Sequence, residues 1–151
     1  MPEPLAGSCL CGAIRFTLSA PVSELRACHC ASCQKASGAS GSVNAVVPLS
    51  AFRITQGTPK RFDAKADSGR TLHRYFCGDC GSPIYSQRAT EHNNMVVVRA
   101  GLLERKDGMK IKANIWTRSA TPWGRRASSC GCTRSIGTAR RRSSSTGSTR
   151  C

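Results

Sequence analysis

Apolar and polar positions alternate in short runs over residues 1–118, and Gly, Pro, Ser and Asn separate the runs. Residues 13–18 (AIRFTL) alternate between apolar and polar side chains from Ile14 on, while residues 41–49 and 94–103 are rich in β-branched side chains. This alternation and this composition are typical of strands, and no segment carries three turns of helical periodicity. The pattern therefore predicts one mainly β domain.

The pattern stops at about Trp123. Residues 124–151 hold a single large aliphatic residue, Ile136, among Ser, Thr, Gly and Arg. Such a segment buries too little apolar surface to offset its ordering entropy, so we expect a folded domain over 1–123 and a disordered basic tail over 124–151. Two other interpretations stay open: a nucleic-acid-binding arm, and the product of a shifted reading frame in a GC-rich gene.

Charge and composition narrow the class of protein. The 151 residues have a formal net charge of +15, and seven of the 23 basic residues but none of the acidic ones follow Trp123. No run approaches the roughly 18 apolar residues of a membrane span, and the first residues lack a secretory signal. We expect a soluble cytoplasmic protein that does not bind membranes. Its oligomeric state is left open by the sequence.

Ten cysteines in a reducing compartment favour metal ligands over disulfides. The first seven fall into three groups, which are Cys9 with Cys11, Cys28 with Cys30 and Cys33, and Cys77 with Cys80. Seven thiolates divide into four and three, which suits a closed structural zinc and a second zinc with an open position. In a strand, residues two apart share a face, so Cys9 and Cys11 could present both sulfurs to one ion, as could Cys28 and Cys30.

A different division of the cysteines is also possible. Cys30 and Cys33 with Cys77 and Cys80 would form a two-knuckle zinc ribbon and leave Cys9, Cys11 and Cys28 without a role. A ribbon beside a basic tail would suggest a nucleic-acid-binding module. The glycines that follow Cys77 and Cys80 favour a metal knuckle in either case, because they permit a tight turn.

Five segments in order, GSCLCGAIRF, CHCASCQKASG, YFCGDCGSPIY, AGLLERKDG and NIWTRSATPW, resemble the glutathione-dependent formaldehyde-activating enzyme family, which includes centromere protein V. The resemblance spans about residues 6–123, with the cysteine spacings and several glycines in register. Ile111 and Asn114 depart from it, since the family often has Pro and His there. The tail does not resemble the family.

The resemblance implies a β-tent-like fold of twisted antiparallel sheets around two zinc ions. It implies that Cys9, Cys11, Cys77 and Cys80 hold a structural zinc, and that Cys28, Cys30 and Cys33 hold a catalytic one. The implied activity is that of a carbon-sulfur lyase, which forms or cleaves S-(hydroxymethyl)glutathione from glutathione and formaldehyde. The alternative function is a zinc-stabilised binding module for nucleic acid or another acidic partner.

Other polar residues near the cysteines are candidates for a role in this chemistry. His29 lies between two cysteines, but in an extended segment its side chain points away from theirs. His73 and His92 have no motif around them, which favours structural or exposed positions. Arg26, Lys35 and Arg74 flank the clusters and could steer an anionic thiol, while the loop 37–42 (SGASGS) could approach a ligand with its backbone amides.

Overall fold

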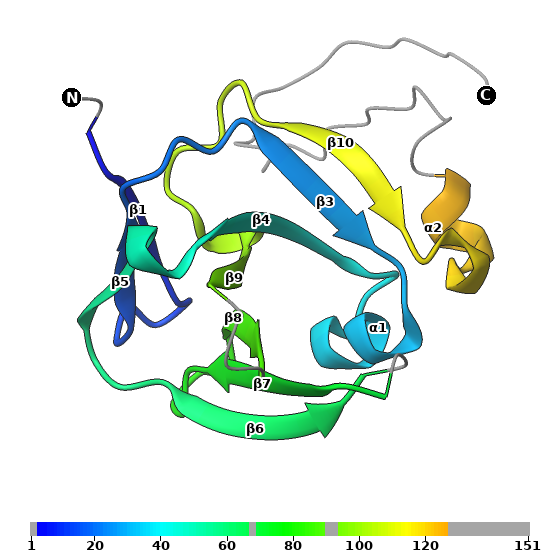
Figure 1. Ribbon diagram of the computed structural model, residues 1–151, viewed down its shortest axis with the longest axis horizontal. Coiled ribbons are helices and arrows are strands. Elements are labelled where there is room, and N and C mark those ends of the chain that lie inside the picture. The colour runs from blue at the N-terminus through cyan, green and yellow to red at the C-terminus, as the bar shows by residue number, and fades with distance from the viewer. Residues whose placement is uncertain (1–2, 67–68, 90–93, 127–151) are drawn as a thin grey trace, which may run out of the picture.

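The computed structural model describes residues 3–66, 69–89 and 94–126. Two sheets make up the fold (Figure 1). The smaller has the order β1-β2-β5, and its strands span Leu5–Ser8, Arg15–Leu18 and Phe52–Gln56. The larger has the order β10-β3-β4-β9-β8-β7-β6. Its strands span, in chain order from β3, Glu24–Cys28, Ser42–Pro48, Lys60–Lys65, Thr71–Phe76, Pro83–Arg88, Met95–Arg99 and Lys110–Ile115.

The large sheet is strongly curved. In Figure 1, β3, β4 and β10 cross the top of the view, β6 and β7 cross the bottom, and β8 and β9 connect them. Neighbouring strands run antiparallel except for β10 and β3, which are parallel. The concave side opens toward the short helix α1, Ala31–Ser37.

The hydrophobic core lies between the two sheets. Phe16 and Leu18 of β2 pack with alternate residues of the large sheet, among them Ala45 and Val47 of β4 and Val98 of β9. Because successive side chains of a strand point to opposite faces, the residues between them face the concave side. This alternation determines which side chains are available to a functional site.

The predicted fold class, mainly β, is confirmed, and the structure shows two sheets that are antiparallel except for the parallel pair of β10 and β3. The expected strands at 13–18 and 41–49 correspond to β2 and β4. The segment 94–103 forms β9 and then a 3-10 helix, Ala100–Leu102. Further 3-10 helices span Leu49–Ala51 and Thr117–Ser119.

Helix α1 was not predicted, because its seven residues include no buried one and so give no apolar stripe. Local chemistry defines its ends instead. The Cys30 sulfur caps its first turn, and Gly38 ends it in the left-handed conformation, with φ 65°.

The C-terminal part of the chain is described only as far as helix α2, Pro122–Arg126. The expected boundary after residue 123 falls within this helix and stays a prediction. The tail that we expect beyond it lies, from residue 127, outside the described residues. Within the described ranges, none of the helices has the length and apolarity that a bilayer crossing requires.

Candidate metal centres and active site

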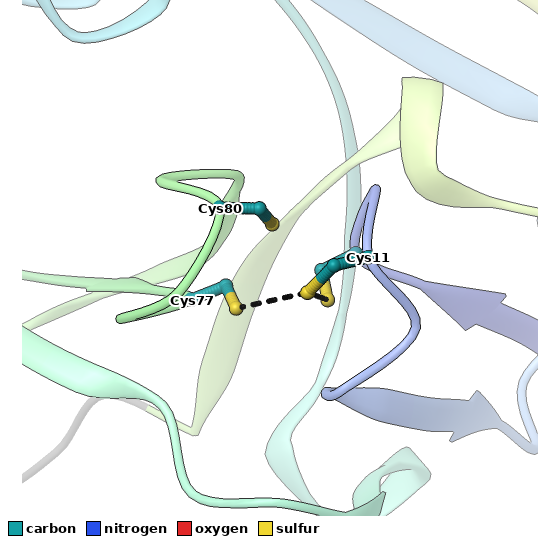
Figure 2. A group of neighbouring side chains, drawn as sticks. Cys11, Cys77 and Cys80 are labelled. Carbon is teal, nitrogen blue, oxygen red and sulfur yellow. Dashed lines mark hydrogen bonds between the residues drawn. The ribbon is translucent and has the colours of Figure 1, made fainter.

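Two turns that are distant in sequence bring four cysteines together. Cys9 and Cys11 lie in the turn between β1 and β2, and Cys77 and Cys80 in the turn between β7 and β8. Their four sulfurs lie within 4.8 Å of one another, with 3.5 Å from Cys9 Sγ to Cys11 Sγ and 3.7 Å from Cys11 Sγ to Cys77 Sγ. Figure 2 shows Cys77 and Cys80 pointing from one turn toward Cys11 of the other. We call this group the four-cysteine cluster.

The expectation that Cys9 and Cys11 share a face of a strand is wrong, because β1 ends at Ser8, and so is the same expectation for Cys28 and Cys30, because β3 ends at Cys28. A tight turn brings the Cys9 and Cys11 sulfurs together instead. In this turn Gly12 has φ 77°, and the Ile14 amide donates to Cys9 Sγ at 3.2 Å. In the other turn Gly81 has φ 73°, a conformation that glycine adopts without strain. The Leu10 amide donates to Ser82 Oγ at 3.1 Å and ties the two turns together.

The geometry of the four-cysteine cluster fits a tetrahedral metal. A zinc-sulfur bond of about 2.3 Å gives a sulfur-sulfur edge of about 3.8 Å in a regular tetrahedron. The observed separations of 3.5 and 3.7 Å lie close to that value. They are far from the roughly 2.05 Å of a disulfide. The hydroxyl and backbone amide of Ser82 also lower the pKa of Cys80 to about 5, which favours the thiolate that a metal requires.

Three cysteines form a second group where β3 meets α1, which we call the three-cysteine cluster. Cys28 ends β3, Cys30 caps α1, and Cys33 lies in its first turn. Their sulfurs also lie within 4.8 Å of one another, and Cys28 Sγ is 3.6 Å from Cys30 Sγ. The Cys33 amide donates to Cys30 Sγ at 3.3 Å. The helix start therefore holds two of the sulfurs in place.

The three thiols share their protons unevenly. A hydrogen bond from the Cys28 thiol, assisted by Ser42, Cys30 and the charge of Arg99, lowers the pKa of Cys33 to about 4. The pKa of Cys28 is raised in turn, first through its hydrogen bond to Cys33 and then through burial. Three sulfurs so close together suit a cation that would favour their deprotonated forms.

The structure groups the cysteines as four and three. Among the described residues, Cys30 and Cys33 do not join Cys77 and Cys80 in one cluster, so the arrangement needed for a two-knuckle ribbon is not formed. Neither group contains a disulfide, because all seven cysteines are free.

A cavity of about 550 Å³ adjoins the three-cysteine cluster, and its volume lies in the range of small-molecule sites. It lies on the concave face of the large sheet, where side chains from β3, β4, β7, β8 and β9 line it. Cys28, Cys30 and Cys33 belong to its wall, and no member of the four-cysteine cluster does. One cluster therefore faces a space for a ligand.

The cavity is strongly basic. Five of its lining residues are arginines, and among the described residues that line it none is Asp, Glu, His or Lys. The remaining wall includes the apolar side chains of Val46, Val97 and Leu72 and the exposed ring of Trp116. The arginines are Arg26, Arg70, Arg74, Arg88 and Arg99. Such a cavity favours an anionic ligand.

Not all of the polar residues considered from the sequence reach this cavity. Arg26 and Arg74 line it, whereas Lys35, His29 and the loop 37–42 do not. The His29 Nε2 atom is 3.1 Å from Asn114 Oδ1 on β10 instead. His73 pairs with Asp63 at 2.7 Å in the β6–β7 pair. His92 lies outside the described residues.

Sequence reasoning missed Arg99 and the residues that hold it. Arg99 Nη1 donates to Asn44 Oδ1 and, at 3.4 Å, to Ser42 Oγ. Ser42 and Asn44 are buried although both are polar, and they alternate with Val43 along β4. Polar residues at alternate positions of a valine-rich strand were the available signal, because they indicate a polar face.

Comparison with known proteins agrees with this geometry. Residues 4–119 match the family model described as glutathione-dependent formaldehyde-activating enzyme. The chain therefore belongs to this family, and the resemblance noted in its sequence is confirmed.

Individual relatives support the assignment over part of their length. A protein of Emericella nidulans, provisionally named a glutathione-dependent formaldehyde-activating enzyme, is 34% identical over 84 residues, which are 56% of this chain and 42% of that protein. A protein of the same provisional name from Podospora anserina is 34% identical over 86 residues, 56% of this chain and 39% of its own. The matches thus span about two fifths of these relatives.

A solved structure shares the fold. The crystal structure of a Rhodobacter sphaeroides protein superposes with a TM-score of 0.55 at 22% identity, over 72% of this chain and 98% of that one. At this identity the likeness concerns the fold alone.

Proposed function

We propose that this chain is a zinc-dependent enzyme that acts on the adduct of a thiol and an aldehyde, as in forming or cleaving S-(hydroxymethyl)glutathione. The observation that carries the proposal is the contrast in surroundings between the clusters. The three-cysteine cluster lines the arginine-rich cavity, while the four-cysteine cluster is closed by its own fourth sulfur. An open coordination position beside a cavity is typical of catalytic zinc sites.

The metal ligands follow from this proposal. Cys9, Cys11, Cys77 and Cys80 would hold a structural zinc, and Cys28, Cys30 and Cys33 a catalytic one. Thiolate ligands suit zinc, and a cytoplasmic location, where thiols stay reduced, belongs to the same proposal. When bound by three thiolates, zinc would offer a fourth position to a substrate thiol and lower that thiol's pKa.

The residues of the cavity bind and orient the reactants. In the forming direction, the substrate sulfur loses its proton to solvent water and attacks the carbonyl carbon of formaldehyde. A carbon-sulfur bond forms as the carbonyl π bond breaks, and the oxygen takes up one proton. The sum is one thiol and one aldehyde giving one hemithioacetal.

Solvent water supplies the proton in this scheme. Apart from the thiols and guanidinium groups, the described residues of the cavity wall offer only hydroxyl and amide side chains and the Trp116 indole, none of which titrates near neutral pH. His29 is directed to Asn114 and is not assigned the role of proton donor. Holding thiol and aldehyde at reacting distance is then the main contribution of the protein.

The test is turnover by the zinc-loaded chain. Glutathione and formaldehyde are mixed at fixed pH, and NMR exchange spectroscopy measures how fast S-(hydroxymethyl)glutathione forms. We expect the zinc-loaded protein to accelerate exchange above the uncatalysed rate, and the Cys33→Ser variant to remain at that rate. Arg53→Gln, which changes an exposed residue of β5 outside the cavity, is the matched control.

Absence of acceleration in a folded protein that carries two zinc ions would contradict the enzymatic proposal. Salt-dependent binding of a DNA duplex by the same protein would then favour the binding-module alternative, because phosphate contacts release counterions.

A further inference from the structure

Two arginines occupy the cavity next to the three-cysteine cluster. Arg74 Nη2 donates to Ser32 Oγ at 2.6 Å, and Ser32 lies between Cys30 and Cys33. Arg99 lines the same cavity as the three sulfurs, and its Nη1 donates at 3.4 Å to Ser42 Oγ, on the residue paired with Cys28. Both guanidinium groups therefore lie beside the position at which a substrate thiol would bind.

The strand register places the two arginines on one face of the sheet. Arg99 of β9 is paired with Asn44 of β4, and Arg74 of β7 with Ser86 of β8. Ser86 is in turn paired with Val97, which lies two residues before Arg99 on the same face. A run of neighbouring strands thus directs both side chains into the concave side.

The pair has less hydrogen-bonding and charge compensation than buried guanidinium groups require. Arg74 Nη1 is buried and has no hydrogen-bond partner. Burial lowers the pKa of Arg99, the charge of Cys33 opposes this effect, and the nearby charge of Arg74 adds to it. Since the described cavity wall contains no carboxylate, no acidic side chain of that wall offsets the repulsion between the two.

The thiolates of the cluster do not balance the positive charge of the cavity. Three thiolates on a divalent zinc carry a formal charge of −1, and a substrate thiolate as fourth ligand would make it −2, whereas five arginines line the cavity. The Nη1 atom of Arg74 would still lack a hydrogen-bond acceptor. A ligand carboxylate would supply both the missing charge and the missing acceptor, and the planar fork of arginine suits carboxylates well.

We propose that Arg74 and Arg99 form a carboxylate clamp that makes this site selective for anionic thiols. The inference rests on the proposed function and deepens it. Arg74 and Arg99 are specificity-determining residues, distinct from the cysteines that hold the metal. Neutral thiols of similar size should enter the cavity but bind weakly.

The experiment compares glutathione with its diethyl ester, which lacks both carboxylates and keeps the thiol. Isothermal titration of the zinc-loaded protein gives the ratio of the two dissociation constants. Visible absorption of the cobalt-loaded protein reports whether sulfur joins the metal. The variants are Arg74→Gln, Arg74→Lys and Arg99→Gln, and Arg53→Gln serves as the control outside the cavity.

We expect glutathione to bind at least about 10-fold more tightly than the diester, the effect of one charge-assisted hydrogen-bonded pair. Arg74→Gln should reduce the ratio to less than about 3-fold, while Arg74→Lys retains an intermediate ratio because its charge persists. Arg53→Gln should leave the ratio unchanged. Because a ratio is measured, a general loss of affinity does not imitate the effect.

Two results would overturn the clamp: equal binding of glutathione and diester by the unaltered protein, or a ratio that neither Arg74→Gln nor Arg99→Gln changes. Failure of the proposed function is a separate observation, in which neither thiol changes the cobalt spectrum. A ratio that still depends on Arg74 would then support the clamp as an anion site without thiol chemistry.

Discussion

The two cysteine clusters use the same donor atom in different surroundings. Cys9 and Cys77 belong to the hydrophobic core, and the four-cysteine cluster surrounds its own centre. The three-cysteine cluster lies at the rim of the concave face, where the fourth side is a basic cavity. The number of thiols alone therefore does not distinguish a structural cluster from a reactive one. The distinction depends on what lies on the remaining side of each cluster.

The clusters also differ in how much chain they join. Cys11 and Cys77 are 66 positions apart, whereas the three-cysteine cluster falls within one short stretch. Cross-linking a long loop removes more freedom from the unfolded chain than cross-linking a short one. A metal in the four-cysteine cluster would therefore contribute more to stability, and one in the three-cysteine cluster more to chemistry.

The strongest test of this difference is Cys77→Ser. Cys77 is 1% exposed and its sulfur completes the four-cysteine cluster, so its loss removes a ligand from inside the core. We expect loss of more than about 4 kcal/mol of the free energy of unfolding, and insoluble protein at 37 °C. Thermal denaturation, monitored by circular dichroism, measures this loss of stability. A soluble Cys77→Ser variant with an unchanged melting temperature would contradict the structural role.

Cys33→Ser is the counterpart in the other cluster. Cys33 is partly buried, and its first-turn position in α1 can accept serine without loss of the backbone hydrogen bonds. We expect a folded protein whose formaldehyde activity falls at least about 100-fold, since one of three metal ligands is gone. Zinc content should fall from two ions to one per chain. An active Cys33→Ser enzyme would remove the three-cysteine cluster from the mechanism.

The packing behind the four-cysteine cluster can be tested with two glycines. A Cβ on Gly7 of β1 would lie 2.4 Å from Cζ of the buried Phe16 ring, while a Cβ on Gly101 meets no atom within 4 Å. Gly7→Ala should therefore destabilise the fold by about 1–3 kcal/mol, and Gly101→Ala by less than about 0.5 kcal/mol. Urea denaturation of both variants measures the two changes in the free energy of unfolding. Equal effects would show that the close contact at Gly7 is not limiting.

The smallest effect is expected at His29. Its Nε2 atom contacts Asn114, and its side chain is not part of the cavity wall. His29→Ala should lower activity less than about 3-fold and cost about 1 kcal/mol of stability, the worth of one hydrogen bond. A pH-rate profile checks the assignment, because loss of a proton donor would remove one limb of the profile. A large drop in kcat with a changed profile would restore His29 to the mechanism.

The sequence predicted what depends on local pattern. Alternation located β2 and β4, and the cysteine spacing together with the family resemblance gave the division into four and three that the structure shows. It did not predict α1, whose seven residues bury none of their side chains. Nor did it show that Cys9 and Cys11 converge through a turn rather than along a strand.

The arginine-lined cavity could not be derived from the sequence for a different reason. Its wall depends on the pairing of β4 with β9 and of β7 with β8, which sets Arg99 and Arg74 on one concave face. Arg99 ends a run of valines and gives no local sign of a role. Register between distant strands is a property of the whole fold, so Arg99 became visible only with the sheet order.

The measurement that tests the central claim most directly is zinc content combined with X-ray absorption at the zinc edge, before and after adding glutathione. We predict two zinc ions per chain, one with four sulfur neighbours throughout and one that changes from three to four sulfurs on addition. A single zinc, or two whose coordination does not change with glutathione, would contradict the account of one closed and one open site.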